Sequence, residues 1–131
     1  MSDEIDALTT VGDLRQAVAA FVDARDWQPF HNAKNLSMSI AIEAAELMEH
    51  FQWLTVEQSR SLAPAALDDV GEELADIVIY ALSLSNFLGL DLADTVLRKM
   101  AKNERKYPAE QVKGKAHKYT YYRDKAVRSE E

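Results

Sequence analysis

The chain has 131 residues, of which 47% are hydrophobic and 28% charged, with only 4 Gly and 3 Pro. This length fits one domain with a real core, and the composition excludes a disordered or fibrous protein. The formal net charge of -7 argues against sequence-independent binding to a nucleic acid polymer, which needs a basic surface. We therefore expect a single helical domain over residues 1–131.

The sequence carries no sign of export or of thiol chemistry. It contains no Cys, so neither a disulfide framework nor a thiolate zinc site can form. Its start, Met1-Ser2-Asp3-Glu4, is acidic, and no long apolar run follows it. We therefore expect no signal peptide, no membrane span and a cytoplasmic location.

The first half of the chain predicts two helices. Residues 1–8 are expected to form a short loose N-terminus, and the first helix to begin near Thr10, where Asp13 completes a capping pattern. Pro29 interrupts the segment 27–32, which is expected to be a loop. The second helix is expected from about residue 35 to 53, because apolar side chains recur there with helical spacing.

The second half predicts two more helices. The pattern weakens over residues 55–64, and a third helix is expected from about 66 to 88, with Gly89 placed to end it. Asp91 is a suitable N-cap for a fourth helix, which the pair Tyr107-Pro108 should stop. From about residue 109 the chain reads as a polar C-terminal tail without a helical stripe.

Two acidic pairs stand out on the predicted second and third helices. Glu43 and Glu46 form one pair and Glu73 and Asp76 the other, each three residues apart and so on one helix face. Glu43 falls within an apolar stripe, where a core residue is expected. If the two helices pack together, four carboxylates converge, and such a group needs a hard cation to offset its repulsion. The pattern therefore predicts a magnesium site.

Other acidic residues are not expected to join the metal site, and the sequence lacks the motifs of several other kinds of site. Glu49 and Glu72 point away from the acidic pairs and are expected to be solvated. No His follows an acid at the spacing of the Glu-x-x-His motif of di-iron bundles, so an oxygen-only site is preferred. The chain also lacks a P-loop, a G-x-G-x-x-G turn and a G-x-S-x-G elbow.

The acidic pairs and their flanking segments together resemble the MazG-like nucleoside triphosphate pyrophosphohydrolases. The similarity extends from about Leu14 to Thr120 and is greatest to the dCTP pyrophosphatase branch. Ile42 stands where the wider family often has an acid, a departure that fits this branch. The segments that carry the resemblance, beside the acidic pairs, are Asp26-Trp27-Gln28-Pro29-Phe30-His31, Phe51-Gln52-Trp53 and Lys99-Met100-Ala101-Lys102-Asn103-Glu104-Arg105-Lys106-Tyr107-Pro108.

The resemblance implies a fold, an assembly and a reaction. The fold is an all-α four-helix bundle of the MazG-like type, assembled as a homotetramer from two dimers. The reaction is hydrolysis of a nucleoside triphosphate, here dCTP or a modified dCTP, to the monophosphate and pyrophosphate. The implied Mg²⁺ ligands are Glu43, Glu46, Glu73 and Asp76.

The remaining site residues are also expectations from the resemblance. Glu46, at the edge of the stripe, is the candidate that positions and deprotonates the attacking water. An unpaired base is recognised by stacking and by hydrogen bonds to its edge. The base pocket is expected to use Trp27, His31 and Trp53, the sugar to lie near Tyr80 and Asn103, and the phosphates near Lys99 and Lys118.

One alternative from another class stays open at this point. The acids can be read as solvated groups on a non-catalytic helical dimerisation or adaptor module, with the aromatics as anchors for a partner protein. Such a module should show heptad continuity, which Glu43 interrupts. It should also gain no thermal stability specifically from Mg²⁺ and nucleotide, whereas an enzyme should.

Overall fold

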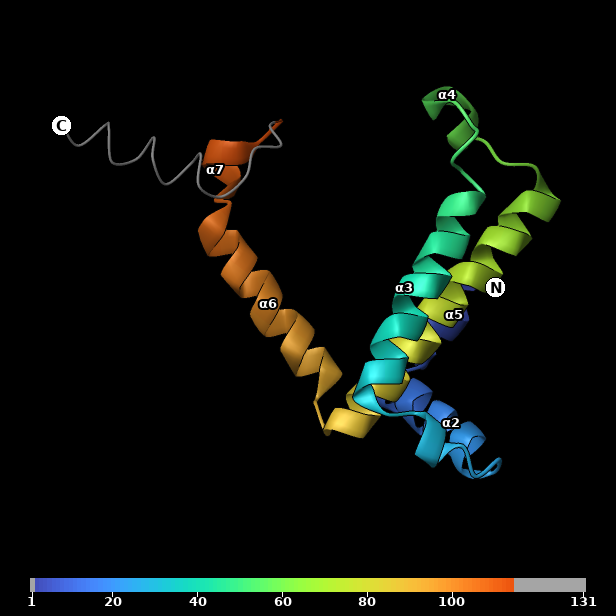
Figure 1. Cartoon of the computed structure of the whole chain (residues 1–131). Helices are drawn as coiled ribbons and strands as arrows, with labels where there is room; N and C mark the ends of the chain where they lie inside the picture. The colour runs from blue at the N-terminus through green and yellow to red at the C-terminus, as the bar shows by residue number, and fades with distance from the viewer. Residues whose placement is uncertain (1, 115–131) are drawn as a thin grey trace. The chain divides into compact units, whose positions relative to one another are not determined.

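The computed structural model describes residues 2–114, and every regular element within this range is a helix. The all-α prediction is confirmed. No single helix in this part of the chain is both long and apolar enough to cross a membrane. The helices (Figure 1) are α1 Ser2–Leu8, α2 Val11–Asp23, the 3-10 turn η1 Gln28–Phe30, α3 Ala33–Glu49, α4 Val56–Ser59, α5 Pro64–Leu88, α6 Leu92–Lys106 and α7 Ala109–Val112.

The chain divides into two compact units, residues 1–90 and residues 91–131. Helices α1 to α5 belong to the first unit, and α6 and α7 belong to the second. The predicted single domain and the predicted four-helix bundle both need α6 to pack with the earlier helices. Both stay predictions.

In the first unit α3 and α5 run antiparallel side by side, and α2 packs on α5 (Figure 1). Among the described residues, the fully apolar core consists of Val22 from α2, Leu36 from α3 and Leu82 from α5. The long helix α5 is therefore the common partner of the other two. Any side chain on its inner faces lies close to α2 or to α3.

A reciprocal polar clamp holds α2 on α5. The Arg15 Nε donates a hydrogen bond to Asn86 Oδ1 at 3.0 Å, and Asn86 Nδ2 donates one to the Arg15 carbonyl at 3.0 Å. Both residues are partly buried, where a satisfied polar pair fixes one relative position of the helices. The clamp sets the register of α2 against the second half of α5.

The helix ends follow the local capping chemistry of the sequence. Thr10 and Asp13 form a reciprocal capping box at the start of α2, as predicted. Asn32 caps α3 through its side chain, and Pro64 occupies the first turn of α5. Gly89 ends α5 in the left-handed conformation at φ 65°, which a residue with a Cβ adopts only at a cost.

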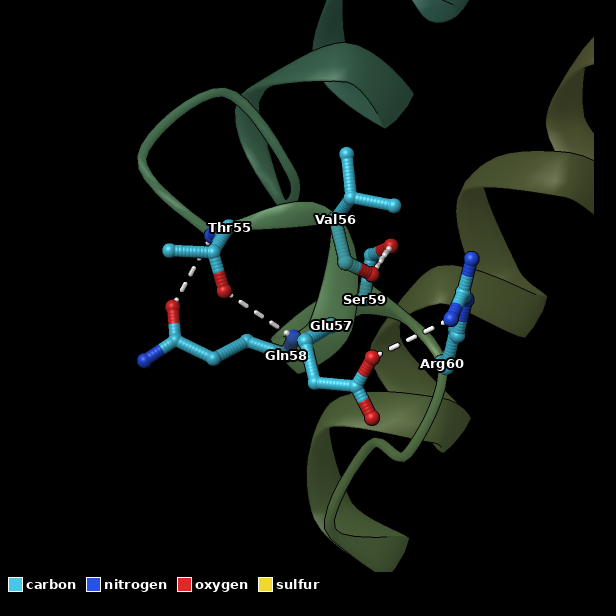
Figure 2. Close-up of polar contacts among 6 residues, drawn as sticks. All are labelled: Thr55, Val56, Glu57, Gln58, Ser59 and Arg60. Atoms are coloured by element: carbon cyan, nitrogen blue, oxygen red, sulfur yellow. Dashed lines mark hydrogen bonds and ion pairs between the residues drawn. The ribbon is translucent and has the colours of Figure 1, made fainter.

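The connection between α3 and α5 contains the short helix α4, within the stretch where the apolar pattern of the sequence weakens. Thr55 Oγ1 accepts a hydrogen bond from the Gln58 backbone, and Gln58 Oε1 accepts one from the Thr55 backbone (Figure 2). Arg60 also pairs with Glu57 at 3.1 Å. This second capping box explains how four residues form a helical turn between two long helices.

Three boundaries differ from the predicted ones. Residues 2–8 form α1 where a loose N-terminus was predicted, and Glu4 in its first turn suits the positive end of a helix. α3 ends at Glu49 rather than near residue 53, because the chain turns after His50. α7 occupies Ala109–Val112 within the predicted polar tail, and the rest of that tail, residues 115–131, lies outside the described residues.

The second unit is described here by α6 and α7 alone. Asp91 caps α6 by accepting a hydrogen bond from the Asp94 backbone at 3.0 Å, as predicted. Asp94 in turn pairs with Arg98 at 2.8 Å. Arg105 and Lys106 occupy the last turn, where positive charge complements the helix dipole.

Candidate metal centre and adjoining cavity

Three of the four predicted acids converge where α3 faces α5. Glu43 extends from α3, and Glu73 and Asp76 from successive turns of α5. One carboxylate oxygen of each lies within 4.8 Å of the other two. The pairing of α3 with α5 is what brings acids from two sequence segments to one point.

Within this cluster, the carboxyl group of Glu43 has a raised pKa. Burial is the largest cause that raises the pKa of the Glu43 carboxyl, followed by a hydrogen bond with Glu46 and the charges of Glu46, Asp76 and Glu73; together they raise it from 4.5 to about 7. Near neutral pH Glu43 is therefore divided between its acid and its carboxylate. A cation bound at this point favours the carboxylate and lowers that pKa.

The donor set fits Mg²⁺. All contributing atoms are carboxylate oxygens, which hard divalent cations prefer. Glu43 Oε2 and Glu73 Oε2 are also buried and have no hydrogen-bond partner. Buried polar atoms normally have a partner, so these two indicate a place for a positive ligand. Glu46 joins the cluster through its hydrogen bond with Glu43 rather than as one of the three convergent acids.

The cluster includes a neighbour that the sequence analysis missed. His50 Nε2 lies 3.8 Å from Glu73 Oε1, within ion-pair range but beyond hydrogen-bond distance. The sequence held a signal for it, because His50 follows Glu43 by seven residues and so shares its helix face. This contact is on Oε1 and leaves the buried Oε2 of Glu73 available.

A cavity of about 360 Å³ adjoins the acids between α2 and α5. This volume is within the usual range of small-molecule sites, about 300–1,000 Å³. Asp76 belongs to both features, since its carboxylate is part of the acidic cluster and its side chain lines the cavity. The lining residues are Ala17, Val18, Phe21, Val22, Trp27, His31, Asp76, Ile79, Tyr80 and Ser83.

Aromatic side chains form one wall of this cavity. The Trp27 and His31 rings are stacked at 6.1 Å between centroids, and Phe21 meets Trp27 edge-on at 5.8 Å. The Arg25 guanidinium lies 3.6 Å from the Phe21 ring centroid, which adds a cation–π contact. The segment 27–32, predicted to be a loop, thus contributes the side chains of Trp27 and His31 to the cavity.

A second cavity of about 220 Å³ lies beside the first. The two share Val18, Val22, His31 and Ser83, whereas Asn86 and Gln28 line the second alone. Ser83 was not among the predicted site residues. Its position continues the flank of Glu73, Asp76 and Tyr80 by three residues, so the helical spacing already placed it there.

The predicted site residues are only partly brought together. Trp27, His31 and Tyr80 line the same cavity, which Asp76 connects to the metal candidates. Trp53 follows α3, is 87% exposed and does not line this cavity. Lys99 and Asn103 lie on α6 in the second unit, and Lys118 lies outside the described residues, so their roles stay predictions.

A family model and individual relatives both connect this chain to the same family of proteins. A model of the MazG-like family matches residues 38–121. dCTP pyrophosphatase 1 from Bos taurus is 39% identical over 113 residues, which cover 85% of this chain and 67% of the relative. The protein of the same name from Homo sapiens is 37% identical over 113 residues, covering 85% and 66%. The chain therefore spans about two thirds of the length of these relatives.

The fold also matches a solved structure. A pyrophosphatase from Archaeoglobus fulgidus superposes with a TM-score of 0.70 and is 41% identical in sequence. The match covers 74% of this chain and 91% of that protein.

Proposed function

The chain belongs to the MazG-like family, and we propose that it hydrolyses (deoxy)nucleoside triphosphates to the monophosphate and pyrophosphate with Mg²⁺. The names of its relatives support pyrophosphohydrolase activity in general. The specific substrate proposed is dCTP or a modified dCTP, acted on in the cytoplasm. Removal of such nucleotides is a housecleaning function for the nucleotide pool.

The observation that carries this proposal is the convergence of Glu43, Glu73 and Asp76 beside a cavity with an aromatic wall. A non-catalytic adaptor has no need for buried, unpartnered carboxylate oxygens. A phosphohydrolase does, because its substrate carries a cation on its phosphates. The cluster and the cavity share Asp76, so the phosphates and the base of one nucleotide have adjacent places.

Different residues of the chain have different roles in the proposed reaction. Glu43, Glu46, Glu73 and Asp76 would hold the cation, which when bound offsets phosphate charge and polarises the scissile bond. Glu46 positions the attacking water and accepts its proton, as a general base within one helical turn of Glu43. No side chain forms a covalent bond to the substrate. Water supplies the nucleophile, and pyrophosphate leaves.

The cavity would hold the nucleoside. Trp27 presents an aromatic surface for stacking, and His31 offers a ring nitrogen, Nδ1, that is buried and has no partner. Tyr80 lies in the same lining and suits a sugar contact. Asn103 is proposed near the sugar as well, and Lys99 and Lys118 near the phosphates.

A homotetramer built from dimers is part of the proposal. Leu67, Leu74 and Val78 lie at i, i+7 and i+11 on α5, and all three are exposed. α3 also exposes Met38 and Ile42. An apolar stripe of this kind on a long helix is typical of an interface, and a second copy of the chain offers a matching stripe. Because Trp53 is exposed and does not line the cavity of its own chain, in such an assembly it would contact the base pocket of a neighbouring subunit.

A screen of nucleotides tests the proposal. Each common dNTP and NTP is incubated with the protein and Mg²⁺, and pyrophosphate and orthophosphate are measured separately. We expect pyrophosphate release that is greatest for dCTP or a modified dCTP and absent with EDTA. The Glu43→Gln variant should lose this activity, whereas Glu49→Gln, at an exposed position on the same helix, should keep it. Release of orthophosphate alone would refute the reaction.

A further inference from the structure

Two buried serines on α5 differ in how their hydroxyls are satisfied. Ser85, 3% exposed, donates a hydrogen bond from Oγ to the Leu82 carbonyl at 2.8 Å. A serine inside a helix commonly satisfies itself in this way. Ser83, 6% exposed, has no hydrogen-bond partner for Oγ. Because a buried hydroxyl without a partner is costly, Ser83 needs an explanation that Ser85 does not.

The cavities around Ser83 explain why its hydroxyl has no partner within the protein. Ser83 lines both cavities between α2 and α5, and Ser85 lines neither. His31 is the other polar residue that lines both, and its Nδ1 is also buried without a partner. Two unsatisfied polar atoms, one from α5 and one from the loop before α3, thus lie on the same apolar hollow. Such a pair suits a ligand with a polar edge inside a largely apolar body.

The position of Ser83 along α5 indicates which part of a nucleotide would contact it. Asp76, Tyr80 and Ser83 follow one another on the cavity side of the helix. Seven residues of α-helix separate Asp76 from Ser83, or about 10 Å along the axis. With phosphates at the acidic cluster, the sugar is next to Tyr80 and the base extends toward Ser83. Trp27, stacked with His31, supplies the aromatic surface beside it.

We propose that Ser83 is a specificity-determining residue whose hydroxyl, together with His31, hydrogen-bonds the polar edge of the substrate's nucleobase. The proposal rests on the proposed nucleotide hydrolysis. A hydroxyl both donates and accepts, so it can pair with an amino group or a carbonyl of a pyrimidine. Its pairing occurs in a buried site, where a base that leaves the hydroxyl unpaired is discriminated against.

The test compares base selectivity in matched variants. Values of kcat/KM for dCTP, dTTP, dUTP and dATP are measured for wild type, Ser83→Ala and the control Ser85→Ala. The isosteric pair Ser83→Thr and Ser83→Val keeps the added volume constant and differs in the hydroxyl. Circular dichroism and thermal denaturation establish that each variant folds.

Ser83→Ala should lower kcat/KM for the preferred base roughly three- to tenfold, the usual effect of one neutral hydrogen bond, and lower it less for the poorest base. Ser83→Val should resemble Ser83→Ala, and Ser83→Thr should stay closer to wild type. Ser85→Ala should leave the ranking unchanged. An unchanged ranking in Ser83→Ala, or an equal loss for every base, overturns the role of Ser83.

Failure of the proposed function gives a different result. If wild type released pyrophosphate from no nucleotide, the proposed hydrolysis would be refuted, and this result would say nothing about the role of Ser83. Dissociation constants of dCMP, dTMP and dAMP, measured with the same variants in EDTA, then decide on Ser83 independently. A selective loss of affinity in Ser83→Ala supports base contact. Equal affinities of wild type and Ser83→Ala for all three overturn it.

Discussion

The raised pKa of Glu43 predicts an unusual pH dependence of stability for the metal-free protein. The folded-state pKa is about 7 and the ordinary value is 4.5, so between these two pH values the folded protein holds a proton that the unfolded chain has released. Its contribution to stability is therefore fully present below pH 4.5 and is lost as the pH rises through about 7. The cluster should destabilise the metal-free fold most above neutral pH.

The size of this effect follows from the two pKa values. At about 1.4 kcal/mol per pKa unit, the rise from 4.5 to about 7 has an upper limit of about 3 kcal/mol. Glu43 is partly exposed, so solvent screening reduces this figure, and we expect about 1–2 kcal/mol. Glu43→Gln removes the titrating group. It should therefore stabilise the metal-free protein by this amount at pH 8 and have little effect at pH 4.5.

Urea denaturation in EDTA at pH 4.5, 6 and 8 measures these free energies of unfolding. Glu49→Gln is the control, because Glu49 is exposed on the same helix. Addition of Mg²⁺ at pH 8 should stabilise wild type, by offsetting the ionised cluster, and should stabilise Glu43→Gln much less. If wild type and Glu43→Gln lost equal stability between pH 4.5 and pH 8, the raised pKa of Glu43 would be wrong.

Further variants test the site and the assembly. Glu46→Gln should lower kcat by orders of magnitude while helical content by circular dichroism stays intact; normal turnover would remove Glu46 from catalysis. Trp27→Ala should raise KM for every base alike, and a loss confined to one base would contradict stacking. Leu74→Glu should shift light-scattering mass toward smaller species, and an unchanged mass would exclude its stripe as the interface. Trp53→Ala should impair activity only in the assembled protein; a fully active monomer would sink the shared-site proposal.

Helical spacing and capping chemistry predicted most of the first unit. Apolar periodicity located α3 and α5, and Thr10 and Gly89 mark helix ends at the predicted places. In the second unit, Asp91 caps α6 as predicted. Where the prediction failed, the ends depend on weaker local signals. α3 stops at Glu49 although its apolar pattern continues, because backbone hydrogen bonds after His50 form a turn instead.

The acidic site could be predicted because its members repeat at helical spacing. Glu73 and Asp76 share one face of α5, and that face continues to Tyr80 and Ser83. Ser83 was missed because a small polar residue in an apolar stripe is usually self-satisfied, and only the structure reveals an unpartnered Oγ. Spacing places His50 on the helix face of Glu43, but its contact with Glu73 depends on how α3 packs on α5.

The central claim is that the carboxylate cluster supports Mg²⁺-dependent cleavage between the α- and β-phosphates of dCTP or a close relative. The most direct measurement is product analysis by ³¹P nuclear magnetic resonance after incubation of dCTP with wild type, with and without Mg²⁺, beside Asp76→Asn. We predict dCMP and pyrophosphate in equal amounts, only with wild type and Mg²⁺. Formation of dCDP and orthophosphate, or equal turnover by Asp76→Asn, would contradict the account.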